Sequence, residues 1–273
     1  MKRRIILVVT MMILLVSTMN MSYAADGIVE TESSSDMVKN IVLNTEALNL
    51  SEEEKEILDN DNALLARKVA MADENEISSI IAESSKDDII INKLKEIAAE
   101  EKISSDKAVS ISLDGNDLVE VYETNDKIVE VGPLYVAIEE KDTETIKDEQ
   151  VSALATTSTK TASANRTYYA KPYGYKMFTV YLTCKFSYDG TKAKYHSGLD
   201  GHYKRYLGGA LYSVSNWKEG KEAAGTAYQA YCRGNFSEGI AIKGTGIVWF
   251  EYYIKHNIKC SKAGKITKTY TMD

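Results

Sequence analysis

A strict alternation of apolar and polar residues dominates the last hundred residues of the chain. From Phe178 to Tyr188 every second residue is apolar or aromatic, and the residues between them are Thr, Tyr, Lys or Ser. The same period of two recurs over residues 228–236 and 248–260. This period predicts strands with one buried face. Further strands are predicted at Tyr168–Lys171, Lys192–His196, Ala210–Trp217 and Ile266–Tyr270.

About seven strands in so short a stretch each need a cover for their apolar face. A second sheet, or the same sheet closed on itself, is the usual cover. We therefore predict that residues 167–273 form an antiparallel β-sandwich or a closed β-barrel. The protein as a whole is expected to be mainly β.

The region before it, residues 51–140, has a different pattern. Ser51 and Glu54 form a capping-box sequence that predicts a helix start. Asp and Asn residues predict a break in this helix near residues 59–62, and Ser84 or Ser85 is expected to cap a second helix. A short meander of strands follows over residues 108–139. The region is expected to be helical with a small α+β unit.

Charge divides the chain into two halves. Residues 25–150 carry 33 acidic and 12 basic side chains, whereas residues 151–273 carry 7 acidic and 18 basic ones, which gives charges of about −21 and +11. The two halves should attract each other within one molecule. The basic half alone should favour anionic surfaces, in a salt-dependent way.

The N-terminus has the features of a secretory signal peptide, assigned to residues 1–24. Lys2, Arg3 and Arg4 precede an apolar run from Ile5 to Val16, and Ser22–Ala24 fits a cleavage site. A transmembrane anchor is the alternative, but a run of twelve residues falls short of the roughly 20 that span a bilayer. The protein is expected to be secreted and extracellular.

Two segments are expected to lack regular structure. Residues 25–50 begin with a Ser- and Glu-rich stretch and are expected to be disordered or weakly ordered. Residues 141–166 are rich in Ser, Thr and Ala and are expected to form a linker. Lys160 and Arg166 in this linker are basic sites that an extracellular protease could cut.

The cysteines and histidines favour structural roles. Three cysteines allow one disulfide, in any pairing of Cys184, Cys232 and Cys260, but all three fall on predicted apolar faces. His256 also falls on such a face, where a lone histidine is usually a core residue. No spacing typical of a catalytic site, a metal site or a cofactor site is found, so none of these is predicted.

Two tyrosine-rich runs are the candidate ligand-binding residues. They interleave aromatic rings with basic side chains, a combination that binds anionic polymers or stacks on sugars. Fifteen of the 18 tyrosines lie in the strand-rich region, as expected for a surface that binds a partner. The candidates are His202, Tyr203, Lys204, Arg205 and Tyr206, within a predicted loop over residues 201–209, and Tyr168, Tyr169, Tyr173 and Tyr175.

Four runs carry a resemblance to a known group: Tyr168–Tyr169, Gly174–Thr179, Phe186–Gly190 and Ala227–Phe236. On these runs the last 105 or so residues resemble small secreted proteins of Gram-positive bacteria, which have a signal peptide, an acidic middle and a strand-rich C-terminal domain. The resemblance implies this organisation. It implies no activity and no site residue.

The leading hypothesis is a secreted, non-catalytic binding module that acts at the cell envelope or on an extracellular anionic or glycan surface. An anionic cell-wall polymer, a glycan or a membrane surface is the expected partner, and no specific nucleic acid is expected. The alternative is a precursor in which the acidic region masks a basic antimicrobial or toxin-like domain. A weaker alternative is an extracellular hydrolase that uses one of the three histidines.

Overall fold

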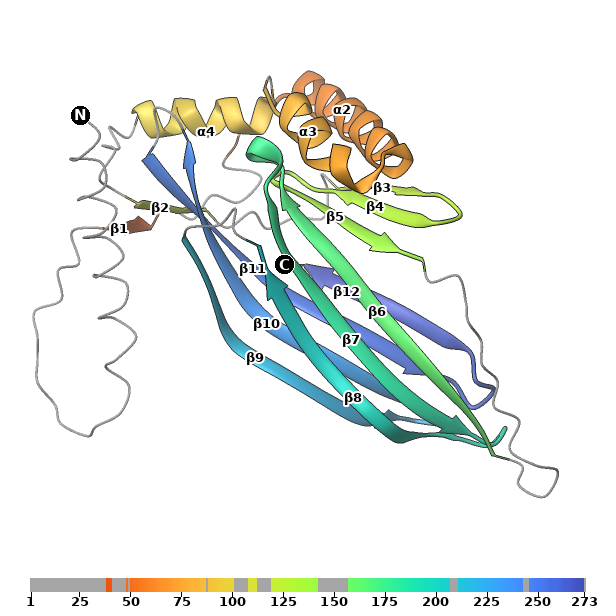
Figure 1. The fold of residues 1–273 in the computed structure, drawn as a ribbon. Helices are drawn as coiled ribbons and strands as arrows, with labels where there is room; N and C mark the ends of the chain where they lie inside the picture. Colours follow the sequence, from red (N-terminus) through yellow and green to blue (C-terminus); the bar gives the residue numbers. More distant parts are fainter. Residues whose placement is uncertain are drawn as a thin grey trace, which may run out of the picture. The chain divides into compact units, whose positions relative to one another are not determined.

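The structure of the protein is a computed structural model. It describes residues 38–40, 48, 50–86, 88–100, 108–111, 119–141, 157–206, 211–242 and 246–272, all of which belong to one unit of the chain. These residues are mostly β, with helices on the N-terminal side (Figure 1). The predicted signal peptide and most of residues 25–50 lie outside the described residues.

One sheet, called sheet B, contains six strands that follow each other in chain order. All neighbouring pairs are antiparallel. The strands are β3 (Glu120–Glu123), β4 (Lys127–Val131), β5 (Tyr135–Glu140), β6 (Ser158–Ala170), β7 (Lys176–Tyr188) and β8 (Ala193–Arg205).

The other sheet, called sheet A, is built mainly from β9 (Leu211–Ala224), β10 (Ala227–Ile242), β11 (Gly246–Cys260) and β12 (Ile266–Met272), which pair in antiparallel fashion. The short strands β1 (Val38–Asn40) and β2 (Ala108–Ile111) extend it in parallel, with β2 paired to the first part of β11. Strands β6 to β12 match the number of strands that alternation predicts for the C-terminal region.

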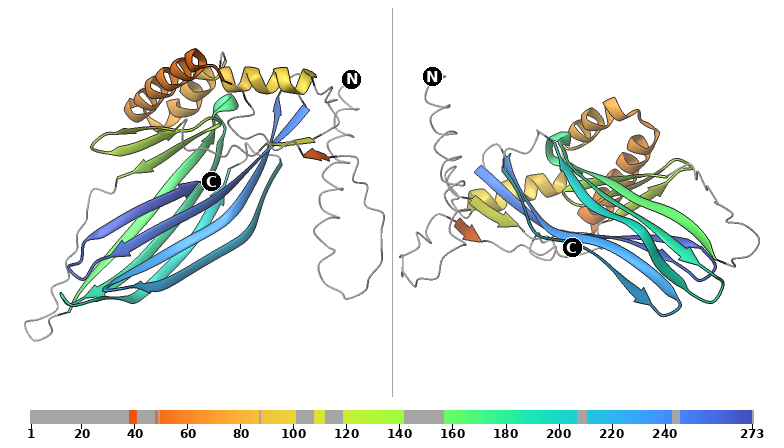
Figure 2. Two further views of the ribbon diagram at one scale, coloured as in Figure 1. Left: turned by 180° about the vertical axis from the view of Figure 1, so that it is seen from behind. Right: turned by 60° about the horizontal axis from the view of Figure 1, so that its bottom comes forward.

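The two sheets pack as a sandwich and do not close into a barrel, so the first of the two predicted architectures is confirmed. Figure 2 shows the two layers of strands from other sides. Phe178 of β7 connects the layers, because its ring stacks on Tyr168 at 4.9 Å and on Phe236 of β10 at 4.4 Å. Such stacked aromatic pairs add to the stabilisation from burial alone.

Helices α2 (Glu52–Met71) and α3 (Glu74–Ser84) cover one part of sheet B, and α4 (Ile89–Glu100) follows them in the chain. They contribute to two cores. Leu58 and Leu94 belong to the core between the sheets, whereas Leu65 and Ile81 pack with Val136 on the opposite face of sheet B. At this end, sheet B is therefore buried on both faces.

The helix starts are partly as predicted. Ser51 and Glu54 form the expected capping box at the start of α2. The predicted break near residues 59–62 is absent, because α2 continues to Met71. Ser85 is the C-cap of α3 rather than the N-cap of the next helix. Asp88 has that role, since its carboxylate accepts a 3.1 Å hydrogen bond from the amide of Ile91.

A buried ion pair ties the helices to the end of β6. The ammonium group of Lys171 lies 2.6 Å from Asp88 Oδ2 and donates a 2.7 Å hydrogen bond to Asn62 Oδ1. The Ser85 hydroxyl donates to the backbone carbonyl of Lys171. Both charged side chains are 3% exposed. Asn62 thus stands in the middle of α2 because it is a partner of this cation.

The structure differs from the predicted linker over residues 158–166. These residues form the first part of β6 and pair with β7. The inward side chains of this segment include Ala162 and Ala164, which are buried but small, so the alternation is weak in the sequence. Because β5 pairs with β6, the acidic and the basic regions share one sheet and one core.

Candidate functional site

The candidate residues 201–205 lie on a strand and not on the predicted loop. They belong to β8, whose pairing with β7 continues to Arg205; residues 207–209 of the predicted loop lie outside the described residues. Gly201 is needed because a Cβ atom there would lie 2.8 Å from the Cβ of Cys232. The glycine therefore permits the close approach of the two sheets and does not mark a flexible segment.

Side chains of β8 alternate between the two faces of sheet B. His202 and Lys204 lie on the outer face, which points away from sheet A. Tyr203 lies inside the sandwich, with its ring 4.8 Å from that of Trp217. By the same alternation, Arg205 is on the inner face of β8, but it is exposed because β8 is at the edge of the sheet. The predicted set is therefore divided between two faces.

The outer face brings together five residues that we call the sheet B cluster. The ring of His202 stacks on Tyr181 of β7, with 4.8 Å between centroids and 17° between planes. The Nζ atoms of Lys176 and Lys204 lie 4.5 and 5.2 Å from the ring centroid of Tyr206. These distances are typical of cation–π contacts. The cluster combines aromatic faces with positive charge on a sheet surface.

Hydrogen bonds hold the rings of the cluster in place. The hydroxyl of Tyr206 lies 3.1 Å from that of Thr179, and Thr179 is 2.9 Å from Thr167 on β6. Burial opposes ionisation of Tyr206, but hydrogen bonds with Thr179 and Tyr181 and the nearby lysines outweigh it and lower the pKa of Tyr206. Burial and the contact with Tyr206 raise the pKa of Tyr181.

Two carboxylates border the cluster. Lys176 donates a 2.9 Å hydrogen bond to Glu74, at the start of α3, and His202 Nδ1 lies 3.0 Å from Asp200 Oδ1. Both carboxylates are well exposed, with side-chain exposures of 71% and 65%. Lys204 lies between these two ends of the cluster and is exposed. An approaching anion would therefore meet Lys204 first.

Tyr168 and Tyr169 do not lie on a surface, contrary to their predicted role in ligand binding. They are 0% and 3% exposed, because β6 lies under sheet A on one face and under the helices on the other. Tyr173 and Tyr175 are exposed as predicted, with 42% and 46% of their surface accessible. Their rings lie 5.7 Å apart, with Tyr173 in the turn Pro172–Gly174 that follows β6 and Tyr175 directly after that turn.

His256 is a buried core residue, as the sequence indicates. Its Nε2 lies 3.0 Å from the hydroxyl of Tyr168, and its Nδ1 lies 3.4 Å from the carbonyl oxygen of Ala164. Burial, together with the nearby Arg166 guanidinium, lowers the pKa of His256 to about 3. The imidazole is therefore neutral at ordinary pH and serves as a hydrogen-bonding core residue.

All three cysteines are buried free thiols, so no predicted disulfide pairing is present. Cys232 faces His256 in the register of β10 and β11, and Cys260 faces Tyr228. Four residues separate the two positions, roughly 13 Å along a strand, whereas a disulfide joins Cα atoms within about 4.4–6.8 Å. Burial raises the pKa of Cys184 to about 11 and that of Cys232 to about 12. None has the features of a reactive nucleophile.

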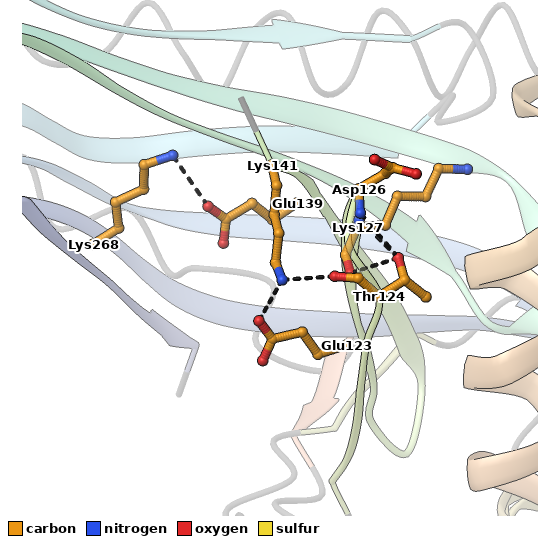
Figure 3. Close-up of polar contacts among 7 residues, drawn as sticks. All are labelled: Glu123, Thr124, Asp126, Lys127, Glu139, Lys141 and Lys268. Atoms are coloured by element: carbon orange, nitrogen blue, oxygen red, sulfur yellow. Dashed lines mark hydrogen bonds and ion pairs between the residues drawn. The ribbon is translucent and has the colours of Figure 1, made fainter. Parts of the chain in front are cut away.

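Ion pairs connect the acidic and basic halves of the sequence inside the fold. Arg166 is 3% exposed, so it is not the accessible protease site predicted for the linker, and its Nη2 lies 2.5 Å from Glu130 Oε2. Lys268 of β12 reaches Glu139 of β5 at 3.4 Å, which links the two sheets (Figure 3). Partly buried charges of this kind need such partners.

The hairpin beside this link is closed by its own polar contacts. Lys141 donates a 2.6 Å hydrogen bond to the carbonyl of Thr124 and pairs with Glu123 (Figure 3). The Thr124 hydroxyl accepts a 3.0 Å hydrogen bond from the amide of Lys127. These contacts satisfy a tight turn and do not form a site.

The described residues contain neither a metal-binding cluster nor a membrane-spanning helix. Among the residues that the structure describes, no group of three or more His, Cys, Asp or Glu side chains is arranged to hold a metal ion. Within the same part of the chain, none of the helices combines the length and apolar character needed to cross a membrane.

Lys176 and Tyr181 belong to the cluster but were not among the predicted binding residues. Alternation already places Tyr181 on the polar face of its strand, and that was the available signal. Its pairing with His202 could not be predicted from the sequence, because β7 and β8 shift register twice near Lys185.

No protein family model, curated protein or solved structure matches this chain.

Proposed function

We propose that the protein is a secreted, non-catalytic module that binds a linear anionic polymer at the cell envelope through the sheet B cluster. The observation that carries this proposal is the placement of two lysine ammonium groups at the ring of Tyr206, next to the stacked pair Tyr181–His202, on the outer face of a sheet. Lysines attract phosphate or carboxylate groups, and aromatic faces contact the sugar or polyol units between them.

The N-terminal sequence supports secretion. Its basic start, apolar run and small-residue cleavage site are typical of a signal peptide. Three thiols buried in the core would be protected from oxidation outside the cell. The resemblance to small secreted proteins of Gram-positive bacteria is consistent with an envelope location.

The continuity of sheet B favours the intact chain over the precursor alternative. Release of residues 167–273 would remove strands β3 to β5 and most of β6. It would also remove Val129, Val131 and the other residues of β4 and β5 that pack with Tyr169, and so would expose Tyr169. A soluble fragment of that kind would carry a large exposed apolar surface.

The test is retention of the full-length chain on teichoic acid beads at low and high salt. Neutral dextran beads and anionic lipid vesicles serve as the glycan and membrane arms. We expect salt-sensitive retention on teichoic acid and little on dextran. Salt-independent binding to dextran, or no binding to any anionic surface, would contradict the proposal.

A charge reversal at the cluster provides the matched comparison. Lys204→Glu should weaken binding to teichoic acid about tenfold at low salt, because each lysine at an anionic surface contributes about 1 kcal/mol and the new carboxylate repels the polymer. Lys262→Glu makes the same charge change at the exposed turn between β11 and β12 and should have a much smaller effect. Equal effects of the two variants would mean that only net charge matters.

A further inference from the structure

The outer face of sheet A carries a row of three cations. Arg233 of β10 lies opposite Lys218 of β9 and opposite Lys255 of β11 in the register of the sheet. The neighbouring residues Cys232 and Ile254 are buried in the core, so the three cations share the face that points away from sheet B. Neighbouring strands lie about 4.8 Å apart, which places three positive charges across about 10 Å.

This row has a cost that the fold alone does not explain. Like charges directly opposite each other destabilise a pair of strands. Among the residues described by the structure, no carboxylate lies within ion-pairing distance of Lys218, Arg233 or Lys255. The other outward charges of these three strands are one positive side chain, Lys259, and two negative ones, Glu222 and Glu251. With four positive and two negative side chains, this face has a net charge of +2.

A tyrosine lies beside the row and is held flat against the sheet. The Nζ of Lys255 is 5.4 Å and the Cζ of Arg233 is 5.8 Å from the ring centroid of Tyr231. The ring lies over Gly220 of β9, because a Cβ atom at that position would be 2.5 Å from the Cζ and hydroxyl oxygen of Tyr231. Gly220 therefore makes room for the ring, and the aromatic face lies within cation–π distance of two of the three cations.

The arrangement repeats the chemistry of the sheet B cluster on the other side of the molecule. In both places, two cationic groups lie 4.5–5.8 Å from one tyrosine ring on the outer face of a sheet. The two inner faces form the common core, so the two outer faces point in opposite directions. One short stretch of polymer cannot contact both faces without bending around the sandwich edge.

We infer that Lys218, Arg233, Lys255 and Tyr231 form a second binding site for a linear polyanion, and that the protein bridges two polymer chains. This inference rests on the proposed function, because the first bound chain occupies the sheet B cluster. A bound polyanion relieves the repulsion within the cation row, so the row favours the bound state. Arg233 supplies a planar donor group suited to phosphate or carboxylate oxygens.

Bridging is tested with the full-length chain and inorganic polyphosphate as the probe. Light scattering should rise when protein is added to long-chain polyphosphate. It should fall again when the polymer is in large excess, because few polymer chains then carry more than one protein and no network forms. In analytical ultracentrifugation without polymer, the parent protein should not self-associate. If it does self-associate and the light scattering follows that self-association, the inference is wrong.

The site is tested with Lys218→Gln together with Lys255→Gln. This double variant keeps Arg233 and its contact with Tyr231, and it should fold at least as stably as the parent, since the row of like charges is relieved. It should still bind polyphosphate through the sheet B cluster but lose the scattering rise. On a dense polyphosphate surface, its apparent affinity should fall roughly tenfold or more as the second contact is lost. Lys192→Gln with Lys262→Gln, both in exposed turns, is the control with equal charge change.

The outcomes separate the two proposals. If the parent chain binds no polyphosphate and no other polyanion, the proposed function fails and the inference fails with it. If the parent binds and Lys204→Glu removes binding, while the Lys218/Lys255 variant scatters like the control, the proposed function stands and the bridging inference is overturned. Loss of scattering in both variants, with residual binding in each, is the expected result.

Discussion

The two halves of sheet B use the same residue types in opposite ways. Along β4 to β6 the sheet is covered by sheet A on one face and by helices on the other, whereas the outer face of β7 and β8 carries the half-buried and exposed sheet B cluster. In the covered half, Lys171 pairs with Asp88 and Tyr168 is fully buried. In the open half, Lys204 and His202 are exposed.

The comparison shows that cover, and not residue type, decides the role of a tyrosine or a lysine here. A charge in the covered half needs a partner, since an isolated buried ion is strongly unfavourable. A charge in the open half can remain without one and is available to a ligand. Four predictions test this contrast.

The largest effect is expected for the buried ion pair. Lys171→Met leaves the carboxylate of Asp88 buried without its cation and should lower the free energy of unfolding by about 3–5 kcal/mol. Adding Asp88→Asn, which keeps an oxygen that can cap α4, should restore much of the loss. Urea unfolding of each variant gives the values. In the open half, Lys204→Met should change stability by about 0.5 kcal/mol or less, and a similar loss at both positions would remove the distinction.

A smaller loss is expected from two glycines that differ only in their surroundings. Gly174 and Gly225 both have a φ near +65°, but a Cβ atom on Gly174 would lie 2.0 Å from the carbonyl oxygen of Ser78 in α3, whereas the space at Gly225 is open. Gly225→Ala should cost about 1–2 kcal/mol from its backbone conformation. Gly174→Ala should cost about 1–3 kcal/mol more, because the helical layer must move. Thermal unfolding measures both, and equal costs would mean that α3 does not press on this turn.

The neutral state of His256 predicts a pH dependence of stability. Its pKa is about 3 in the folded chain, below the value of about 6.5 in the unfolded chain, so the unfolded state takes up the proton first as the pH falls. This contribution to stability is complete above pH 6.5 and is lost between about pH 6.5 and 3, with a slope approaching 1.4 kcal/mol per unit. His256→Phe should flatten that part of the profile. The exposed His196→Gln is the control and should follow the parent chain.

The smallest expected signal is at the cysteines, where the folded chain should show almost no reaction. Iodoacetamide at neutral pH should leave the mass of the folded protein unchanged, because the three thiols are buried and burial raises the pKa of each. Three adducts should form after denaturation without a reducing agent. A single adduct under those conditions would reveal a disulfide and would contradict the free-thiol structure.

Alternation in the sequence was sufficient to predict the long strands and their buried faces. It was insufficient for β6, because a strand whose inward side chains include Ala162, Ala164 and a paired Arg166 has no strong apolar period. Asn62 likewise resembles a helix break until its partner Lys171, 109 residues away, is known. Long-range polar partners of this kind leave no local signal.

The sequence predicted His202, Lys204 and Tyr206 of the candidate site, but not its other two residues and not its geometry. Extending the pairing from Tyr188 and Ala193 would put Tyr181 opposite Asp200, but two register shifts put it opposite His202. Because the shifts total two residues, each side chain keeps its face while its neighbour changes. The register shifts therefore determine which of the predicted residues are neighbours, and the helices determine which of them are buried.

The order of the strands also bears on how the chain reaches this structure. Sheet B is a run of consecutive hairpins from β3 to β8, and most of sheet A is a second run from β9 to β12, so nearly all strand pairing joins neighbours in the sequence. Each run can form quickly by local steps, but neither has its apolar face covered until they meet. We expect docking of the two meanders to limit the folding rate, and the intermediate before it to be the species most prone to aggregate.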